Sequence, residues 1–163
     1  MAMTLAQILQ RNIDLLESCG VAYRQWTHEP ILDFEMDGKI GAELGWTATP
    51  TKSLFLRLKN GGNALLLTHR DARLDSKQIK TLLGKRPSIA SDEEMITQLG
   101  CRPGAVCPFA LPEDIPLVVD EVLFTFDELM YTPGPPELTF AFPAKALPDI
   151  LGALPNPVYY LNA

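Results

Sequence analysis

The chain has 163 residues, of which 47% are hydrophobic, and it carries a formal net charge of −6. This length is enough to bury one core, so we expect a single domain over residues 1–163. The acidic balance argues against a protein that binds nucleic acid through a broad basic face, because that mode needs many Lys and Arg at phosphates. Any nucleic-acid contact is therefore expected to be small and local, and no DNA partner is expected.

The sequence also argues against a membrane or secreted protein. No run approaches the roughly 18 apolar residues that a membrane span requires, and the N-terminus lacks the apolar segment of a signal peptide. We therefore expect a cytoplasmic protein with no membrane partner. Its three cysteines, Cys19, Cys101 and Cys107, have spacings that match no zinc or redox motif, so we expect reduced thiols and no cofactor.

Hydrophobic periodicity and turn residues define the first half of the chain. Apolar residues recur every three to five positions from Leu5 to Leu16, which predicts a helix within residues 1–20 that packs on the domain. The run Asn60-Gly61-Gly62-Asn63 lies between two apolar segments and is typical of a hairpin turn. The elements expected here are the helix ending at Gly20, a strand at 21–28, a helix at 36–44, and strands at 51–58 and 64–68.

The second half opens with two helices and continues mainly with strands. Asp75 or Ser76 can cap the first helix, and the capping box that begins at Ser91 opens the second. The expected elements are helices at 76–83 and 92–99, strands at 115–120, 122–126, 129–132 and 138–142, a helix at 143–154, and a strand or tail at 158–161. This irregular order favours an α+β fold with a mixed, largely antiparallel sheet and packed helices over a doubly wound parallel fold.

Residues 100–109 contain two glycines, two prolines and two cysteines. Glycine permits a sharp turn and leaves its N–H open to a ligand, and proline stiffens the chain that follows. The segment Gly104-x-x-x-Pro108 is therefore typical of a rigid loop that presents main-chain donors. Taken alone, the same pattern also describes an ordinary tight connection.

Further short motifs occur in a fixed order along the chain. They are His28-Glu29-Pro30, Lys52 ahead of the hairpin, Arg73-Leu74-Asp75, Ala90-Ser91-x-x-Glu94, Gly104-Ala105-Val106-Cys107-Pro108, Val118-Val119-Asp120 and Gly134. In this order and spacing, the chain from about Val21 to the final helix resembles the YbaK/EbsC-like (ProX-type) aminoacyl-tRNA deacylases, which are related to the editing domain of bacterial prolyl-tRNA synthetase. Each motif is weak by itself, and the order makes the resemblance specific.

The resemblance implies hydrolysis of the ester between a wrong amino acid and the 3′-terminal adenosine of a tRNA, of the tRNA(Pro) type, without metal or protein nucleophile. It implies that Lys52 holds the terminal nucleotide, that Gly104 offers its backbone to the aminoacyl group, and that a tRNA hydroxyl helps to activate the water. The implied partner is the 3′ end of aminoacyl-tRNA, with an aminoacyl-tRNA synthetase as a second candidate. The other expected substrate-binding residues are His28, Ala105, Val106, Cys107, Pro108, Asp120, Gly134 and Thr139.

Elementary chemistry is compatible with this assignment. An aminoacyl ester is already activated, so the site has to position water and stabilise the developing oxyanion. One backbone donor at the oxyanion is worth about 3 kcal/mol of barrier. A single contact from Lys52 to a phosphate is compatible with an acidic protein.

The sequence leaves several alternatives open. Cys107 stands where family members usually carry Ser or Thr, and Pro103 and Ala105 depart from a Gly-Gly pair, so the amino acid removed is left undefined. These departures also allow a catalytically silent module that binds tRNA ends or a synthetase, or a hydrolase with Cys107 as nucleophile. Asp120 is equally explained by substrate binding or by bonds to loop N–H groups, and His28 by a pocket role or a loop cap.

Overall fold

The structure is a computed structural model that describes residues 2–162. Within these residues, eight strands form a mixed sheet in the order β1-β7-β6-β2-β3-β5-β8, with β4 paired to β2 outside this order. The strands are β1 Arg24–Thr27, β2 Thr49–Leu58, β3 Asn63–His69, β4 Pro87–Ile89, β5 Leu117–Asp120, β6 Glu128–Tyr131, β7 Leu138–Pro143 and β8 Val158–Leu161. The α-helices are α1 Leu5–Ser18, α2 Phe34–Leu44, α3 Ser76–Leu83, α4 Asp92–Leu99 and α5 Leu147–Gly152. The expected mixed sheet with packed helices is confirmed.

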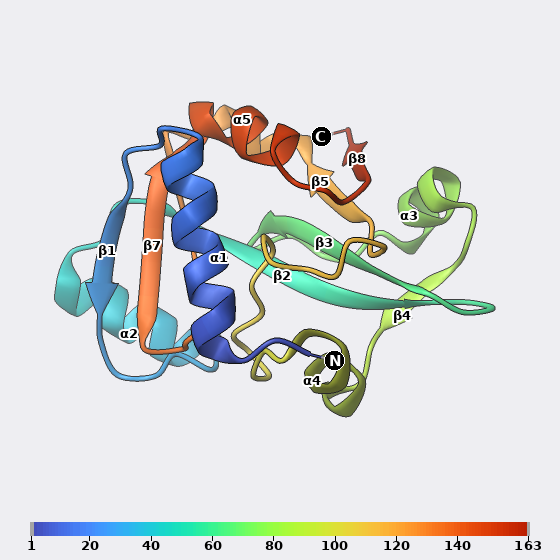
Figure 1. Cartoon of the computed structure of the whole chain (residues 1–163), viewed down its shortest axis with the longest axis horizontal. Coiled ribbons are helices and arrows are strands. Elements are labelled where there is room, and N and C mark those ends of the chain that lie inside the picture. Colours follow the sequence, from blue (N-terminus) through green and yellow to red (C-terminus); the bar gives the residue numbers. More distant parts are fainter. Residues whose placement is uncertain (1, 163) are drawn as a thin grey trace.

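The sheet consists of two half-sheets that share only a short seam. Strands β1, β7 and β6 form one half, and β2, β3, β5 and β8 form the other. The halves meet where Thr49 and Pro50 of β2 pair in parallel with Leu129 and Met130 of β6. In Figure 1, β7 runs almost at right angles to β2, which shows how far the two halves diverge. Beyond Pro50, β2 therefore continues without β6 beside it.

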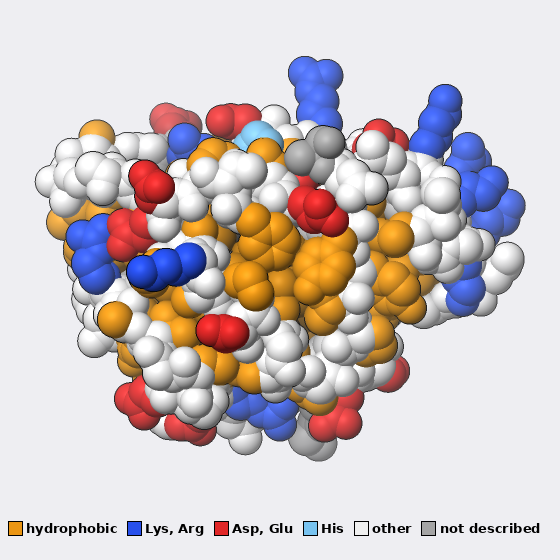
Figure 2. All heavy atoms as spheres, turned by 90° about the horizontal axis from the view of Figure 1, so that it is seen from above, with side chains coloured by type: hydrophobic (Ala, Val, Ile, Leu, Met, Phe, Trp, Pro, Cys, Tyr) orange, Lys and Arg blue, Asp and Glu red, His pale blue; other side chains and the backbone are white. Residues whose placement is uncertain are grey.

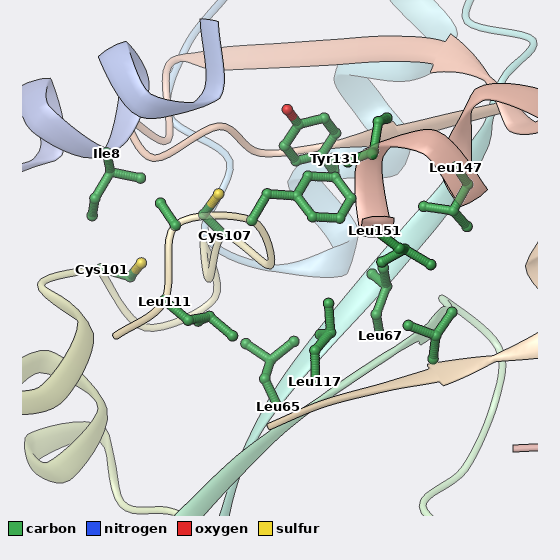
Figure 3. Packing of buried hydrophobic residues seen from close by; sticks show 14 of the residues in the cluster. Ile8, Leu65, Leu67, Cys101, Cys107, Leu111, Leu117, Tyr131, Leu147 and Leu151 are labelled. Carbon is green, nitrogen blue, oxygen red and sulfur yellow. The ribbon is translucent and has the colours of Figure 1, made fainter. Parts of the chain in front are cut away.

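The core of the protein is continuous across this seam. In the main hydrophobic cluster, Ile8 and Leu16 of α1 pack with Phe140 of β7 and with Leu65 and Leu67 of β3. Figure 3 shows the loop that carries the two buried cysteines inside the same cluster. A second cluster lies on the other face of β3, under α3, so alternate residues of β3 are buried on opposite faces. Helix α1 thus packs on the sheet through Ile8 and Leu16.

Three local elements differ from the sequence predictions. Residues 122–126 are not a strand, because the carboxylate of Asp120 accepts the N–H of Val122 at 3.0 Å and caps a 3₁₀ helix, Glu121–Thr125. The helix predicted over 143–154 is divided into a 3₁₀ turn, Ala144–Ala146, and α5. Strand β4 was not predicted, because three residues carry no readable alternation and depend on pairing with β2.

Replacing Leu16 tests whether α1 is part of the folding unit. Leu16 is fully buried in the main cluster, so Leu16→Ala should lower the free energy of unfolding by about 2–5 kcal/mol through lost contacts and a cavity. Arg11 is exposed on the same helix, and Arg11→Ala should change the free energy of unfolding by less than about 0.5 kcal/mol. Urea unfolding of both variants measures the difference. Equal, small effects would show that α1 is dispensable for folding.

Candidate functional site

A pocket of about 400 Å³ opens where the two half-sheets part. Its wall is formed by β2 from Pro50 to Phe55, the end of β6, and the segment that leads into α2. The turn containing Pro103 and Gly104 closes another side. The pocket therefore exists because β2 leaves β6 after Pro50, and the loop singled out by its composition faces the gap.

The edge of β2 that lines the pocket has no strand beside it. On that side, β2 pairs with β6 only up to Pro50 and with β4 only from Leu56 onward. Arg70 N–H donates to the C=O of Pro50 at 3.1 Å, so even-numbered residues of β2 turn their main-chain groups toward β3. Ser53 consequently turns its N–H and C=O toward the uncovered edge. The N–H of Ala90 donates to the C=O of Phe55 at 2.9 Å, so the uncovered part ends before Phe55. We call residues 51–54 the open edge of β2.

Gly104 is held in the pocket wall by two constraints. Gly104 has a φ of +82° and directly follows Pro103. The turn is closed by a 2.9 Å hydrogen bond from the N–H of Ala105 to the C=O of Arg102, as in a type II turn. A Cβ at Gly104 would lie 1.9 Å from the carbonyl oxygen of Leu32, which leads into α2. The Gly104 N–H donates to no atom of residues 2–162 and remains available to a ligand. Glycine is thus required here both by φ and by the close approach of Leu32.

Lys52 lines the same pocket from the open edge of β2. Its Nζ donates to the C=O of Ala72, which directs the side chain across the end of β3. Partial burial lowers the pKa of the Lys52 ammonium, and the nearby carboxylate of Asp71 opposes this shift. An anion bound beside Nζ would offset the desolvation, so this lysine is suited to a phosphate.

His28 lies behind the pocket wall and contacts Thr139, which lines it. His28 Nε2 is 2.8 Å from the hydroxyl of Thr139, and its Nδ1 is 2.6 Å from the C=O of Glu29. Since a carbonyl can only accept, Nδ1 carries a proton, and in the neutral ring Nε2 accepts from Thr139. The Trp46 ring packs edge-on against His28 at 5.6 Å. His28 therefore fixes the hydroxyl of Thr139 in the wall.

An ion pair at the pocket was not found from the sequence. Arg70, the residue after β3, and Asp37 of α2 both line the pocket, and their side chains meet at 3.0 Å. They are distant in the sequence and belong to no motif, so only the folding of the chain brings them together. The contact of Leu32 with Gly104 was missed for the same reason.

Cys107 belongs to the core and not to the pocket surface. It is buried, and Asn12 of α1 donates to its Sγ at 3.2 Å. Burial raises the pKa of the Cys107 thiol to about 12, and the neighbouring Cys101 is the second cause of this increase. Asn12 also accepts the hydroxyl proton of Tyr131, a pocket residue, at 2.9 Å. The thiol therefore serves packing and does not form the thiolate that a nucleophile needs.

The remaining candidate residues occupy different places. Val106 lines the pocket, whereas Ala105 and Pro108 are buried within the loop. Asp120 lies in another hollow, where it accepts the hydroxyl proton of Thr68 at 2.8 Å in addition to capping the 3₁₀ helix. Gly134 is buried, and a Cβ there would lie 2.9 Å from Ile8 of α1. The pocket itself thus brings together four of the predicted residues: Lys52, Gly104, Val106 and Thr139.

Residues 2–162 contain neither a cluster of metal ligands nor a helix that could span a membrane. No group of three or more His, Cys, Asp or Glu side chains is arranged to hold a metal ion. Within the same residues, no helix is both long and apolar enough to cross a membrane.

The chain is similar to known proteins both in sequence and in structure. A family model described as an aminoacyl-tRNA editing domain matches residues 42–150, which include Lys52 and Gly104. The uncharacterized protein YwhH of Bacillus subtilis (strain 168) is 29% identical over 120 residues, which cover 68% of this chain and 74% of YwhH.

Two solved structures share the fold over almost the whole chain. The hypothetical protein APE2540 has a TM-score of 0.76 at 24% identity and covers 92% of this chain and 97% of its own. A protein described as a candidate trans-editing enzyme for prolyl-tRNA synthetase has a TM-score of 0.72 at 22% identity, with coverages of 96% and 97%.

The packing of Gly104 against Leu32 can be tested with a matched glycine. Gly84 has a similar φ of +76°, but a Cβ there would have no atom within 4 Å. Gly84→Ala should therefore cost only backbone strain, about 1 kcal/mol, whereas Gly104→Ala should cost about 1–3 kcal/mol more. Urea unfolding measures both. Equal losses would show that Leu32 does not constrain the turn.

Burial of Cys107 predicts its chemical reactivity. With a pKa of about 12, on the order of 10⁻⁴ of the thiol is thiolate at pH 8. Iodoacetamide should therefore modify the half-buried Cys19 of the native protein at pH 8 and leave Cys107 unmodified, whereas both should react in urea. Peptide mass spectrometry reads out each site. Modification of native Cys107 as fast as Cys19 would contradict the buried assignment.

Proposed function

Because the chain belongs to the aminoacyl-tRNA editing domain family, we propose that it is a deacylase that acts in trans on mischarged tRNA. It hydrolyses the ester between a wrong amino acid and the 3′-terminal adenosine. The observation that carries the proposal is that Lys52 and Gly104, from distant segments, line one pocket of about 400 Å³. This volume falls in the range of pockets that hold small ligands, about 300–1,000 Å³.

Lys52 is assigned to the terminal nucleotide. Its ammonium carries three protons, and one is used by the C=O of Ala72, so two remain for phosphate oxygens. The partial burial that lowers its pKa also strengthens its attraction to an anion, since solvent screening is weaker there. A single phosphate contact of this kind orients the RNA end without requiring a basic protein.

The turn at Gly104 is assigned to the aminoacyl group. Water attacks the ester carbonyl carbon, a new C–O bond forms, the bond to the ribose oxygen breaks, and that oxygen takes up a proton. The products are the free amino acid and the tRNA with its terminal hydroxyl restored. The free N–H of Gly104 is the donor for the developing oxyanion, worth about 3 kcal/mol. The vicinal ribose hydroxyl of the tRNA helps to orient the attacking water.

The pocket wall near Thr139 is assigned to selection of the amino acid. Thr139 and its partner His28 supply a fixed polar contact, and Met130 and Val106 supply apolar surface. A site that hydrogen-bonds one substrate group discriminates strongly against substrates that lack it. For the tRNA we propose the tRNA(Pro) type, which is supported by the description of one structural relative as a candidate trans-editing enzyme for prolyl-tRNA synthetase.

A panel of mischarged tRNAs tests the proposal. The protein should release the amino acid from at least one species, and at the same rate in EDTA, since we propose no metal. Lys52→Ala should lower kcat/KM at least tenfold, about 1.4 kcal/mol, through loss of the phosphate contact. Lys145 is exposed and lies outside the pocket, so Lys145→Ala is the matched control and should be unchanged.

The panel also separates the alternatives. Full activity in Lys52→Ala would refute the role given to that lysine. Binding of aminoacyl-tRNA with no turnover of any species would replace the deacylase by a module that only binds tRNA ends.

A further inference from the structure

Five cations gather at the end of the molecule formed by the β2–β3 hairpin, the C-terminal end of α3 and the start of β4. We call this group the basic tip; its members are Arg57, Lys59, Lys80, Lys85 and Arg86. All five are exposed, and they line two adjoining hollows. Figure 2 shows Lys and Arg side chains gathered at the right-hand end, which is the hairpin end in Figure 1.

The charges of the basic tip are not neutralised within the described part of the protein. The ion pairs among residues 2–162 are Arg24 with Glu128 and Arg70 with Asp37, and neither involves the tip. One carboxylate, that of Glu94, lines the same hollow and is bound by the side-chain amide of Asn63 at 2.8 Å. The chain as a whole carries a net charge of −6, yet these like charges lie together and repel one another. An anion bound at the tip would offset this repulsion. The tip is therefore suited to an external anion.

The basic tip is connected to the pocket by β2 itself. In the pairing of β2 with β4, Leu56 lies opposite Ile89 at the pocket, and the next pair, Arg57 with Ser88, belongs to the tip. Because side chains alternate along a strand, Arg57 and Lys59 project from the same face as Ser53. At about 3.3 Å per residue, Ser53 and Lys59 are about 20 Å apart.

This spacing fits a nucleic acid that enters the pocket by its end. Stacked nucleotides follow one another at about 3.4 Å along one strand, so about 20 Å corresponds to about six nucleotides. The unpaired 3′ end of a tRNA is shorter than this, so a phosphate at the tip belongs to the paired stem and not to the terminal nucleotide. Exposed Lys and Arg contacts to phosphates position a nucleic acid without reading its sequence.

We propose that the basic tip binds phosphates of the acceptor stem of the tRNA whose 3′ end occupies the pocket. The identity of the RNA rests on the proposed function, whereas the binding itself does not require hydrolysis. The tip provides the local nucleic-acid contact that an acidic protein allows, with Lys52 at the RNA end and the tip on the stem. Its charges are spread over residues 57–86, so no charge run in the sequence marks it.

The probe is a fluorescein-labelled RNA minihelix that consists of the acceptor stem and the CCA end and carries no amino acid. Its binding is followed by fluorescence anisotropy from 50 to 200 mM salt. The variant is Lys59→Gln/Arg86→Gln, and the control is Arg11→Gln/Lys145→Gln, two exposed cations outside both hollows. The tip variant should bind at least tenfold more weakly at 50 mM salt. Its slope of log K against log salt should be shallower by about 1.5, because two phosphate contacts are lost. The control should stay within twofold.

A minihelix without the CCA end distinguishes the tip from the pocket. The tip variant should lose affinity for both RNAs, whereas Lys52→Ala should lose affinity only for the RNA that carries the CCA end. Unchanged affinity and salt slope in the tip variant, with the fold intact by circular dichroism, would overturn the inference even if mischarged tRNA is hydrolysed. Loss of binding in the tip variant would support it even if no species in the panel is hydrolysed.

Discussion

The structure depends on the short seam between β2 and β6. The two strands pair only through Thr49 and Pro50 with Leu129 and Met130, and the hydroxyl of Thr51 adds one 2.8 Å bond to the C=O of Met130. A longer seam would cover the open edge of β2 and remove the pocket. Because the seam is short, main-chain groups in the middle of a well-packed strand face a cavity. A strand edge thus forms part of the wall of the candidate site.

The elements around the pocket are held by the core and not by the site itself. Asn12 of α1 connects the buried Cys107 to Tyr131 in the wall, and the carbonyl of Leu32 packs against Gly104. The N-terminal helix therefore supports the loop and the wall from behind. The cysteines in the loop serve this packing, and the exposed turn presents the bare main chain of Gly104.

Local chemistry made a large part of this structure predictable. The Asn60-Gly61-Gly62-Asn63 turn has φ values of +70° at Asn60 and above +90° at the next two residues. Asn and Gly adopt positive φ most readily, so the residue types alone indicated a hairpin. Helices α3 and α4 begin directly after Asp75 and Ser91 because these side chains accept main-chain N–H groups of the first turn. What could not be predicted depends on long-range pairing. Asp37 and Arg70 meet only in the folded chain, and nothing local shows that Asp120 lies in a hollow away from Gly104.

A crystal structure with a non-hydrolysable aminoacyl-adenosine analogue tests the central claim most directly. The account predicts that the acyl group lies between the open edge of β2 and the turn at Gly104, with its carbonyl oxygen within hydrogen-bonding distance of the Gly104 N–H. It also predicts that Lys52 Nζ lies at the phosphate of an analogue extended by one nucleotide. An analogue bound in the hollow of Asp120, or one that leaves the gap between β2 and β6 unoccupied, would contradict the account.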